Sequence, residues 1–492
     1  MSKERKGNQS LKEGEVEKIG LNREEYRDKV LACWLGKNIG GTLGTPYEGR
    51  KYVHGLTFYD PVPPEPLPND DLDFQLVWLK MLEDRGSKLT FKDFADYWIK
   101  HLSGHWYAEY SYSIYNIQRG LMPPISGAFQ NYFVDEMGSP IRSEIWACVA
   151  PADPQLAASM AWMDSSTDHT GGEGRWGEMF WAAAESAAFV IKDPKILIQI
   201  GLSMIPISSH ISRVIREAVR CYENGVKWSE ARERIVTIFG HHQPCNAIPN
   251  HGFTIIGLLY GKDYGDKLCK AVNCGYDTDC TGATLGSLLG IMHGTKIIPD
   301  EWRKVVGDVI TPCKQTVMTG LPKTVSELTE RTEKVAEKFL RERSGVAEIA
   351  QKFSVPENLV SMMFQNEKVR DLLTFDNQSA VENIGDTEVV FHYGGEPVLY
   401  PGIERMFEIS TKKAGKVIEP DAEVRGPSGW KISSPVTERF RCKFSVLADN
   451  VENQNSLELT VKLDGKTHKV NFTVLGPGGI KAIPAAASAP KG

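Results

Sequence analysis

Two segments far apart in the sequence carry glycines spaced four residues apart, and this spacing limits what the chain can fold into. Residues four apart lie on one face of an α-helix, and each glycine costs a helix about 1 kcal/mol relative to alanine. Three such glycines in register predict that another backbone passes close to each helix. We expect the two helices to pack against each other along these glycines, which are Gly36, Gly40 and Gly44 in the first segment and Gly282, Gly286 and Gly290 in the second.

Acidic residues lie at the ends of both glycine helices. Pro46 is expected to end the first helix and to leave Glu48 just beyond it, and Asp277 and Asp279 precede the glycines of the second. Packing of the two helices would bring Glu48 and these two aspartates into one pocket.

A third acidic cluster, Asn69-Asp70-Asp71-Leu72-Asp73, precedes an apolar helix predicted over 74–82. Helix capping explains one acid at such a position, but three neighbouring carboxylates repel one another. Each of the acidic clusters alone fits a helix cap. Together they favour a site for a hard divalent cation such as Mg²⁺ or Ca²⁺, which prefers oxygen ligands.

The pattern of apolar and polar residues along the chain changes near residue 377. Apolar residues recur at helical spacing up to about residue 343, whereas Leu457 to Val474 alternates apolar and polar residues around a hairpin turn at Asp464-Gly465. We predict an all-α domain followed by a small all-β module of the immunoglobulin-like sandwich type. The predicted boundaries are a flexible leader over 1–20, the helical domain over 21–344, a helical connector over 345–376, the β-sandwich over 377–475 and a flexible tail over 476–492.

The net charge and the cysteines of the chain limit which partners it can bind and in which cellular compartment it is expected. The chain has 57 basic and 63 acidic residues, so its net charge is −6. A chain with this excess of acids lacks the broad basic surface that nucleic-acid binding requires. No apolar run reaches the length of a membrane span, and the start of the chain lacks a secretory signal. The nine cysteines are odd in number, scattered and without a CxxC pair. We therefore expect a cytoplasmic protein that binds neither nucleic acid nor membranes.

Four segments of the sequence, taken in order, resemble motifs of the ADP-ribosylglycohydrolase family, which includes dinitrogenase-reductase-activating glycohydrolases. Residues 43–48 match the family pattern L-G-x-P-x-E, and residues 69–72 match T-D-D-T in part. Residues 275–280 resemble G-G-D-T-D-T, and residues 164–174 resemble a segment that lines the substrate cleft in relatives. The similarity spans roughly residues 26 to 320.

The resemblance implies an all-α fold with a centre of two Mg²⁺ ions, for which Mn²⁺ or Ca²⁺ can substitute. It implies His169 and Gly174 as substrate-binding residues. The candidate catalytic residues are Asp70 and Asp71, of which one could bind a cation while the other accepts the proton of the water, and Glu48 as the rival base. Trp106 and Tyr107 could stack on a sugar or a base, or could be ordinary core aromatics. The implied metal ligands are Glu48, Asn69, Asp70, Asp71, Asp277, Asp279, Cys280 and Thr281.

Two positions depart from the family pattern. Asn69 and Cys280 each replace a threonine, and a thiol is a poor ligand for Mg²⁺. Thr281 could supply the missing ligand through a shift of one residue; otherwise the second cation would be weakly held or absent.

The main hypothesis is a metal-dependent glycoside hydrolase that cleaves a ribosyl or furanosyl bond, O- or N-linked, through attack of a metal-oriented water on the anomeric carbon. Its substrate would be a small-molecule glycoside or an ADP-ribosylated molecule. One alternative keeps the fold but changes the substrate to another furanoside or N-glycoside, such as a nucleoside or a sugar conjugate. A second alternative is a catalytically inactive binding protein. The β module is assigned an accessory role or a role in forming a homo-oligomer.

Overall fold

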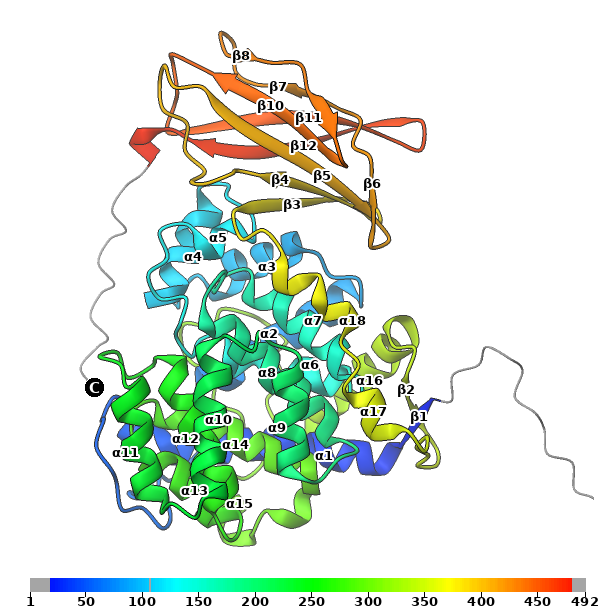
Figure 1. The fold of residues 1–492 in the computed structure, drawn as a ribbon. Helices are drawn as coiled ribbons and strands as arrows, with labels where there is room; N and C mark the ends of the chain where they lie inside the picture. The colour runs from blue at the N-terminus through cyan, green and yellow to red at the C-terminus, as the bar shows by residue number, and fades with distance from the viewer. Residues whose placement is uncertain (1–17, 106–107, 480–492) are drawn as a thin grey trace, which may run out of the picture.

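The computed structural model describes residues 18–105 and 108–479 and shows a helical domain followed by antiparallel sheets (Figure 1). Both parts of the predicted fold class are therefore confirmed. The helices of the first domain are α1 (Arg23–Gly44), α2 (Asp70–Arg85), α3 (Phe91–Tyr97), α4 (Ala108–Gln118), α5 (Ile125–Ala128), α6 (Ser143–Val149), α7 (Pro154–Ser165), α8 (Glu173–Ala188), α9 (Pro194–Ser203), α10 (His210–Glu223), α11 (Trp228–Phe239), α12 (Ala247–Tyr260), α13 (Tyr264–Asn273), α14 (Thr278–His293), α15 (Asp300–Val306) and α16 (Val325–Arg343).

Helices α1 and α14 pack against each other along their glycines, as predicted. A Cβ atom added to Gly36 would lie 2.1 Å from the carbonyl oxygen of Gly286, and one added to Gly40 would lie 2.0 Å from that of Gly282. The contact continues to Gly44, whose added Cβ would lie 2.2 Å from the carbonyl oxygen of Thr278. The two backbones touch directly, so the end of α1 and the start of α14 are held together.

The N-terminal end of the described chain pairs with the segment that follows the helical domain. Strand β1 (Ile19–Asn22) pairs in parallel with β2 (Ala347–Ala350). The predicted connector over 345–376 contains this strand, which was not predicted, followed by the short helices α17 (Leu359–Met363) and α18 (Glu367–Arg370). Residues 1–17 of the predicted leader and 480–492 of the predicted tail lie outside the described residues.

The C-terminal module consists of two antiparallel sheets with a shared core. One sheet has the order β3-β4-β5-β10-β8, with β6 and β9 at its edges, and the other has the order β12-β11-β7. The rings of Phe391 and Phe472 stack between the sheets with their centroids 5.0 Å apart, and Asp464 and Gly465 form the predicted hairpin turn with positive φ angles. The strands are β3 (Ser379–Ile384), β4 (Thr387–His392), β5 (Arg405–Lys413), β6 (Lys416–Ile418), β7 (Ala422–Arg425), β8 (Lys431–Ile432), β9 (Val436–Glu438), β10 (Arg441–Leu447), β11 (Gln454–Leu463) and β12 (Lys466–Leu475).

A segment of the helical domain inserts into the core of the β module. Leu121, Ile125 and Phe129, around α5, are buried together with the apolar residues of the two sheets. The backbone of Val381 in β3 donates to the carbonyl oxygen of Pro123 at 3.1 Å. Figure 1 shows the sheets at one end of the helical domain, with α4 and α5 beneath β3. The module is thus packed against the helical domain rather than attached through a linker alone.

Two further features bear on the sequence predictions. Within residues 18–105 and 108–479, no helix has both the length and the apolar character needed to cross a membrane. All nine cysteines lie in the described ranges, and no disulfide joins any of them. The cytoplasmic location stays a prediction.

Candidate metal centre

The first group of possible ligands forms where α1 ends. Helix α1 passes into a short 3₁₀ turn at Thr45–Tyr47, and Glu48 follows it. One ligand atom each of Glu48, Asp277 and Cys245 lies within 4.8 Å of the others. The glycine contact between α1 and α14 therefore brings Glu48 to Asp277, as the sequence predicted. Cys245 was not predicted.

The second group lies deeper in the protein and joins the start of α2 to the start of α14. One ligand atom each of Asp71, Asp279 and Cys280 lies within 4.8 Å of the others. Asp71 is fully buried, and Asp279 and Cys280 are 8% and 9% exposed. Each group thus combines two carboxylates with one thiol.

A strained turn sets the direction of Asp277. Gly275 and Tyr276 both have positive φ angles, of 76° and 71°, and the latter is unusual for a residue with a bulky side chain. The backbone of Tyr276 pairs with the loop after Glu48, because its N–H donates to the carbonyl oxygen of Arg50 at 2.8 Å. Arg232 donates to carbonyl oxygens on both sides of this contact, those of Cys274 and Lys51. These bonds hold the loop that carries Glu48 against the loop that carries Asp277.

The polar side chains of the Asn69–Asp73 segment, at the start of α2, have different partners. Asn69 is the N-cap, since its side-chain oxygen accepts from the N–H of Asp71 at 2.8 Å. Asp73 accepts from the N–H of Cys313 and from the hydroxyl of Thr316, and so anchors the loop over 313–316. Asp70 is partly exposed and Asp71 is buried. The capping interpretation therefore holds for Asn69, while Asp71 remains available as a ligand.

Thr281, the alternative ligand to Cys280, points into its own helix. Its hydroxyl donates to the carbonyl oxygen of Thr278 at 3.2 Å, and the residue is fully buried. The Cys280 thiol lies beside Asp71 and Asp279. The role of Thr281 as a metal ligand stays a prediction.

The electrostatics of the cluster are those of carboxylates held close to one another. Burial, followed by the charges of Asp277 and Asp70, raises the pKa of Glu48 to about 8, although the residue as a whole is exposed. Burial and the charge of Asp277 raise the pKa of Asp70 to about 6. The pKa of Asp71 and that of Asp279 lie well above the ordinary value, with burial as the main cause and neighbouring carboxylates adding to it. A bound cation would remove this mutual repulsion.

The positive charge of a buried lysine, Lys37, compensates part of the negative charge of these carboxylates. Lys37 Nζ lies 2.7 Å from Glu144 Oε1 and 3.5 Å from Asp71 Oδ1. Burial alone would lower the pKa of Lys37, but the charges of Glu144 and Asp71 outweigh it and raise that pKa. Gln75 donates to Glu144 and accepts from the N–H of Ile145. Lys37 therefore stays charged and fixes the position of Asp71.

The donor set fits a divalent cation. Both carboxylate oxygens of Asp71 and Oδ1 of Asp279 have no hydrogen-bond partner although they are buried. A buried carboxylate oxygen without a partner carries a desolvation cost of several kcal/mol unless something compensates it. A cation between these oxygens would supply that compensation.

His169 and Gly174, the predicted substrate-binding residues, lie against each other in the interior. An added Cβ at Gly174 would lie 2.5 Å from Cδ2 of His169, whose side chain is fully buried. The backbone of residues 134–137 connects them to the first ligand group, since Gly174 N donates to Val134 O and Met137 N donates to Cys245 O. Their role in binding substrate stays a prediction. Trp106 and Tyr107 lie outside the described residues.

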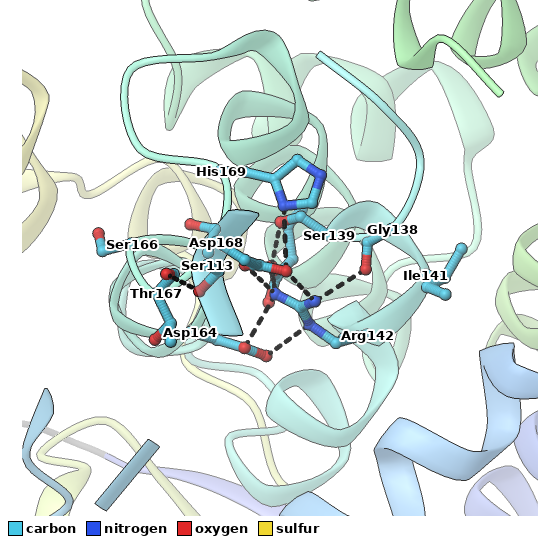
Figure 2. Close-up of polar contacts among 12 residues, drawn as sticks. Ser113, Gly138, Ser139, Ile141, Arg142, Asp164, Ser166, Thr167, Asp168 and His169 are labelled. Carbon is cyan, nitrogen blue, oxygen red and sulfur yellow. Dashed lines mark hydrogen bonds and ion pairs between the residues drawn. The ribbon is translucent and has the colours of Figure 1, made fainter. Parts of the chain in front are cut away.

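His169 borders a buried charge network that the sequence did not reveal (Figure 2). Nδ1 of His169 lies 3.2 Å from Asp168, which forms two bonds with the guanidinium of Arg142. Arg142 also contacts Asp164 at 3.0 Å and Glu178 at 3.7 Å. All of these side chains are fully buried. The network fixes the loop over 164–170 from which His169 extends.

A family comparison agrees with this arrangement. The model of the family described as ADP-ribosylglycohydrolase matches residues 22–344, which is most of the helical domain. The chain belongs to the ADP-ribosylglycohydrolase family. The predicted resemblance is thereby confirmed. Membership supports an activity of the glycohydrolase type in general, and members of this family are typically metal-dependent.

A solved chain with the description "ADP-ribosylglycohydrolase-related protein complex" is 19% identical to this ADP-ribosylglycohydrolase family member, with a TM-score of 0.40. The match covers 65% of this chain and 99% of that chain. No curated protein matches the sequence.

The crowding of acids in this family member gives a prediction about stability. In the presence of EDTA, we expect Asp279→Asn to raise the free energy of unfolding by about 1 kcal/mol or more, because the amide removes one buried acid whose pKa is raised. A raised folded-state pKa means that stability is lost as pH increases, so the gain should be larger at pH 8 than at pH 5. Thermal unfolding at both pH values measures it. Asp96→Asn, at an exposed position paired with Lys92, is the control, and an equal gain in the control would refute the explanation.

Two residues at the centre were not predicted from the sequence. Cys245 lies about 30 residues before Asp277, in a segment without a recognisable metal motif. Lys37 lies within the first glycine helix, where a lysine is expected on a solvated face. The composition could have indicated otherwise, because Lys37 is the only charged residue between Val30 and Gly44.

Proposed function

We propose that this chain is a metal-dependent glycoside hydrolase that cleaves a ribosyl or related furanosyl bond. The observation that carries the proposal is the convergence of Glu48, Asp71, Asp277 and Asp279 at the paired ends of α1, α2 and α14, with buried carboxylate oxygens that lack partners. Family membership supports the hydrolase class.

The four converging acids are assigned to holding divalent cations, Mg²⁺ being the one predicted from the sequence. When bound, such cations orient the hydroxyls of the sugar and lower the pKa of a water molecule. Asp71 is a poor general base because it is buried beside Lys37. Asp70 is partly exposed, and its pKa of about 6 suits a group that accepts a proton near neutral pH. We assign the base to Asp70, with Glu48 as the alternative.

A second candidate keeps this chemistry but changes the substrate to another furanoside or an N-glycoside. The packing of the β module around α5 favours it, because Ser126 in α5 donates to the carbonyl oxygen of Thr167, two residues before His169. The loop predicted to bind substrate therefore contacts α5, the helix that packs into the core of the β module.

Turnover of a substrate panel tests the proposal. ADP-ribosyl-arginine, ADP-ribosyl-serine and aryl furanosides would be incubated with wild type and with Asp277→Asn, and the products identified by mass. We expect at least about a 100-fold loss of kcat/KM in Asp277→Asn, since changes beside metal ligands already cost 10- to 100-fold. Asp96→Asn is the matched control and should retain activity. Cation binding without turnover of any compound would favour the inactive binding protein.

A further inference from the structure

Both groups of the metal centre contain a thiol beside two carboxylates. Cys245 lies beside Glu48 and Asp277, and Cys280 lies beside Asp71 and Asp279. The Cys245 sulfur lies within 4.8 Å of a carboxylate oxygen of Asp277. The two sulfur atoms therefore face the interior of the centre, where ligand atoms are needed.

An independent observation is that buried carboxylate oxygens at this centre lack hydrogen-bond partners. Asp71 is fully buried, yet neither of its carboxylate oxygens has a hydrogen-bond partner, and Oδ1 of Asp279 is in the same situation. A carboxylate oxygen of each of these residues lies within 4.8 Å of the Cys280 sulfur, because each residue of the group contributes one ligand atom. A cation that satisfies the two carboxylates would lie next to the thiol.

The chemistry of sulfur decides which cation that is. Mg²⁺ requires oxygen ligands in nearly ideal octahedral geometry and gives up its waters reluctantly. Zn²⁺ accepts cysteine sulfur at about 2.3 Å together with carboxylate oxygen at about 2.0–2.2 Å. Thiolate ligands also select zinc over magnesium in general. Two carboxylates and one thiol form a donor set suited to zinc.

We propose that this centre binds a thiophilic divalent cation such as Zn²⁺ in preference to Mg²⁺, with Cys280 as a ligand beside Asp71 and Asp279 and Cys245 as a ligand beside Glu48 and Asp277. The proposal deepens the proposed function, because it rests on the centre holding cations. It does not depend on which glycoside is cleaved.

Spectroscopy and calorimetry of the full chain test the proposal without reference to activity. After removal of metals with EDTA, the protein would be titrated with Zn²⁺, Cd²⁺, Co²⁺ and Mg²⁺ under a reductant that keeps the thiols reduced. Cd²⁺ and Co²⁺ should produce the ultraviolet charge-transfer band of a metal–sulfur bond. We expect Zn²⁺ to bind at least about 100-fold more tightly than Mg²⁺.

Matched variants assign the sulfur ligands. Cys280→Thr restores the oxygen found in the family pattern, and it should weaken the charge-transfer band and reduce the preference for Zn²⁺ at least about tenfold while Mg²⁺ binding persists. Cys245→Ser should weaken the band in the same way and serves if the first variant does not fold. Cys221→Ser changes a thiol on α10 that contacts Glu217 and should leave both measurements unchanged.

The outcomes separate this proposal from the proposed function. A wild type that binds Mg²⁺ as tightly as Zn²⁺, or a band of equal strength in wild type, Cys280→Thr and Cys245→Ser, would overturn the thiol ligands while leaving a carboxylate-held cation intact. Absence of binding by every cation, in wild type as in Asp277→Asn, would overturn both proposals.

Discussion

Gly40→Ala is expected to lower the free energy of unfolding by about 3 kcal/mol, despite the better helix propensity of alanine. The new methyl group would lie 2.0 Å from the carbonyl oxygen of Gly282 and 2.6 Å from the N–H nitrogen of Ala283. Both contacts are with backbone atoms, so no side chain can rotate away and α1 and α14 must separate. Overpacking of this kind costs about 1–3 kcal/mol or more, which exceeds the gain of about 1 kcal/mol in propensity.

The same variant should also weaken cation binding, because the glycine contact holds Glu48 against Asp277. Urea unfolding followed by circular dichroism and calorimetric titration with a divalent cation measure the two effects. Gly345→Ala is the control, since an added Cβ there would have no atom within 4 Å. If the Gly40→Ala protein were as stable as this control, α1 and α14 would be able to move apart without a loss in the free energy of unfolding.

The helix pair and the acids at its ends were predictable from the sequence because local patterns determine them. A spacing of four residues identifies a helix face, and a backbone contact is the main reason to keep three glycines on it. Pro46 and the acidic residues then mark the helix ends. The alternation around Asp464 similarly predicted the hairpin, whose register depends on a two-residue turn.

Other parts of the fold depend on contacts between distant segments, and no local pattern indicates them. Strand β1 contains only four residues and pairs with β2, more than 300 residues later in the chain. Cys245 reaches the metal centre only because the segment over 134–137 pairs with the segment before α12. Arg142 has Glu144 as its nearest acid in the sequence, whereas it contacts Asp164, Asp168 and Glu178. Burial of a charged residue follows from tertiary packing and is seldom visible in its neighbours along the chain.

Arg142→Met is expected to cost about 3–5 kcal/mol of stability, the range seen when one partner of a buried ion network is removed. The guanidinium is fully buried between Asp164 and Asp168, and it also donates to the carbonyl oxygen of Gly138 (Figure 2). Methionine has a similar volume, so the loss would come from carboxylates left without their cation and not from a cavity. Thermal unfolding in comparison with wild type measures it.

The pH dependence of this loss identifies its cause. In wild type, burial alone would raise the pKa of Asp168, but the charge of Arg142 holds that pKa below its ordinary value. Without Arg142, burial would raise it above the unfolded-state value, and stability would then fall as pH increases. We therefore expect a larger deficit at pH 8 than at pH 5. Lys334→Met, at an exposed pair with Glu330, should change stability by less than about 0.5 kcal/mol at either pH. A deficit that is the same at both pH values would mean that Arg142 acts through packing, because uncompensated carboxylates must respond to protons.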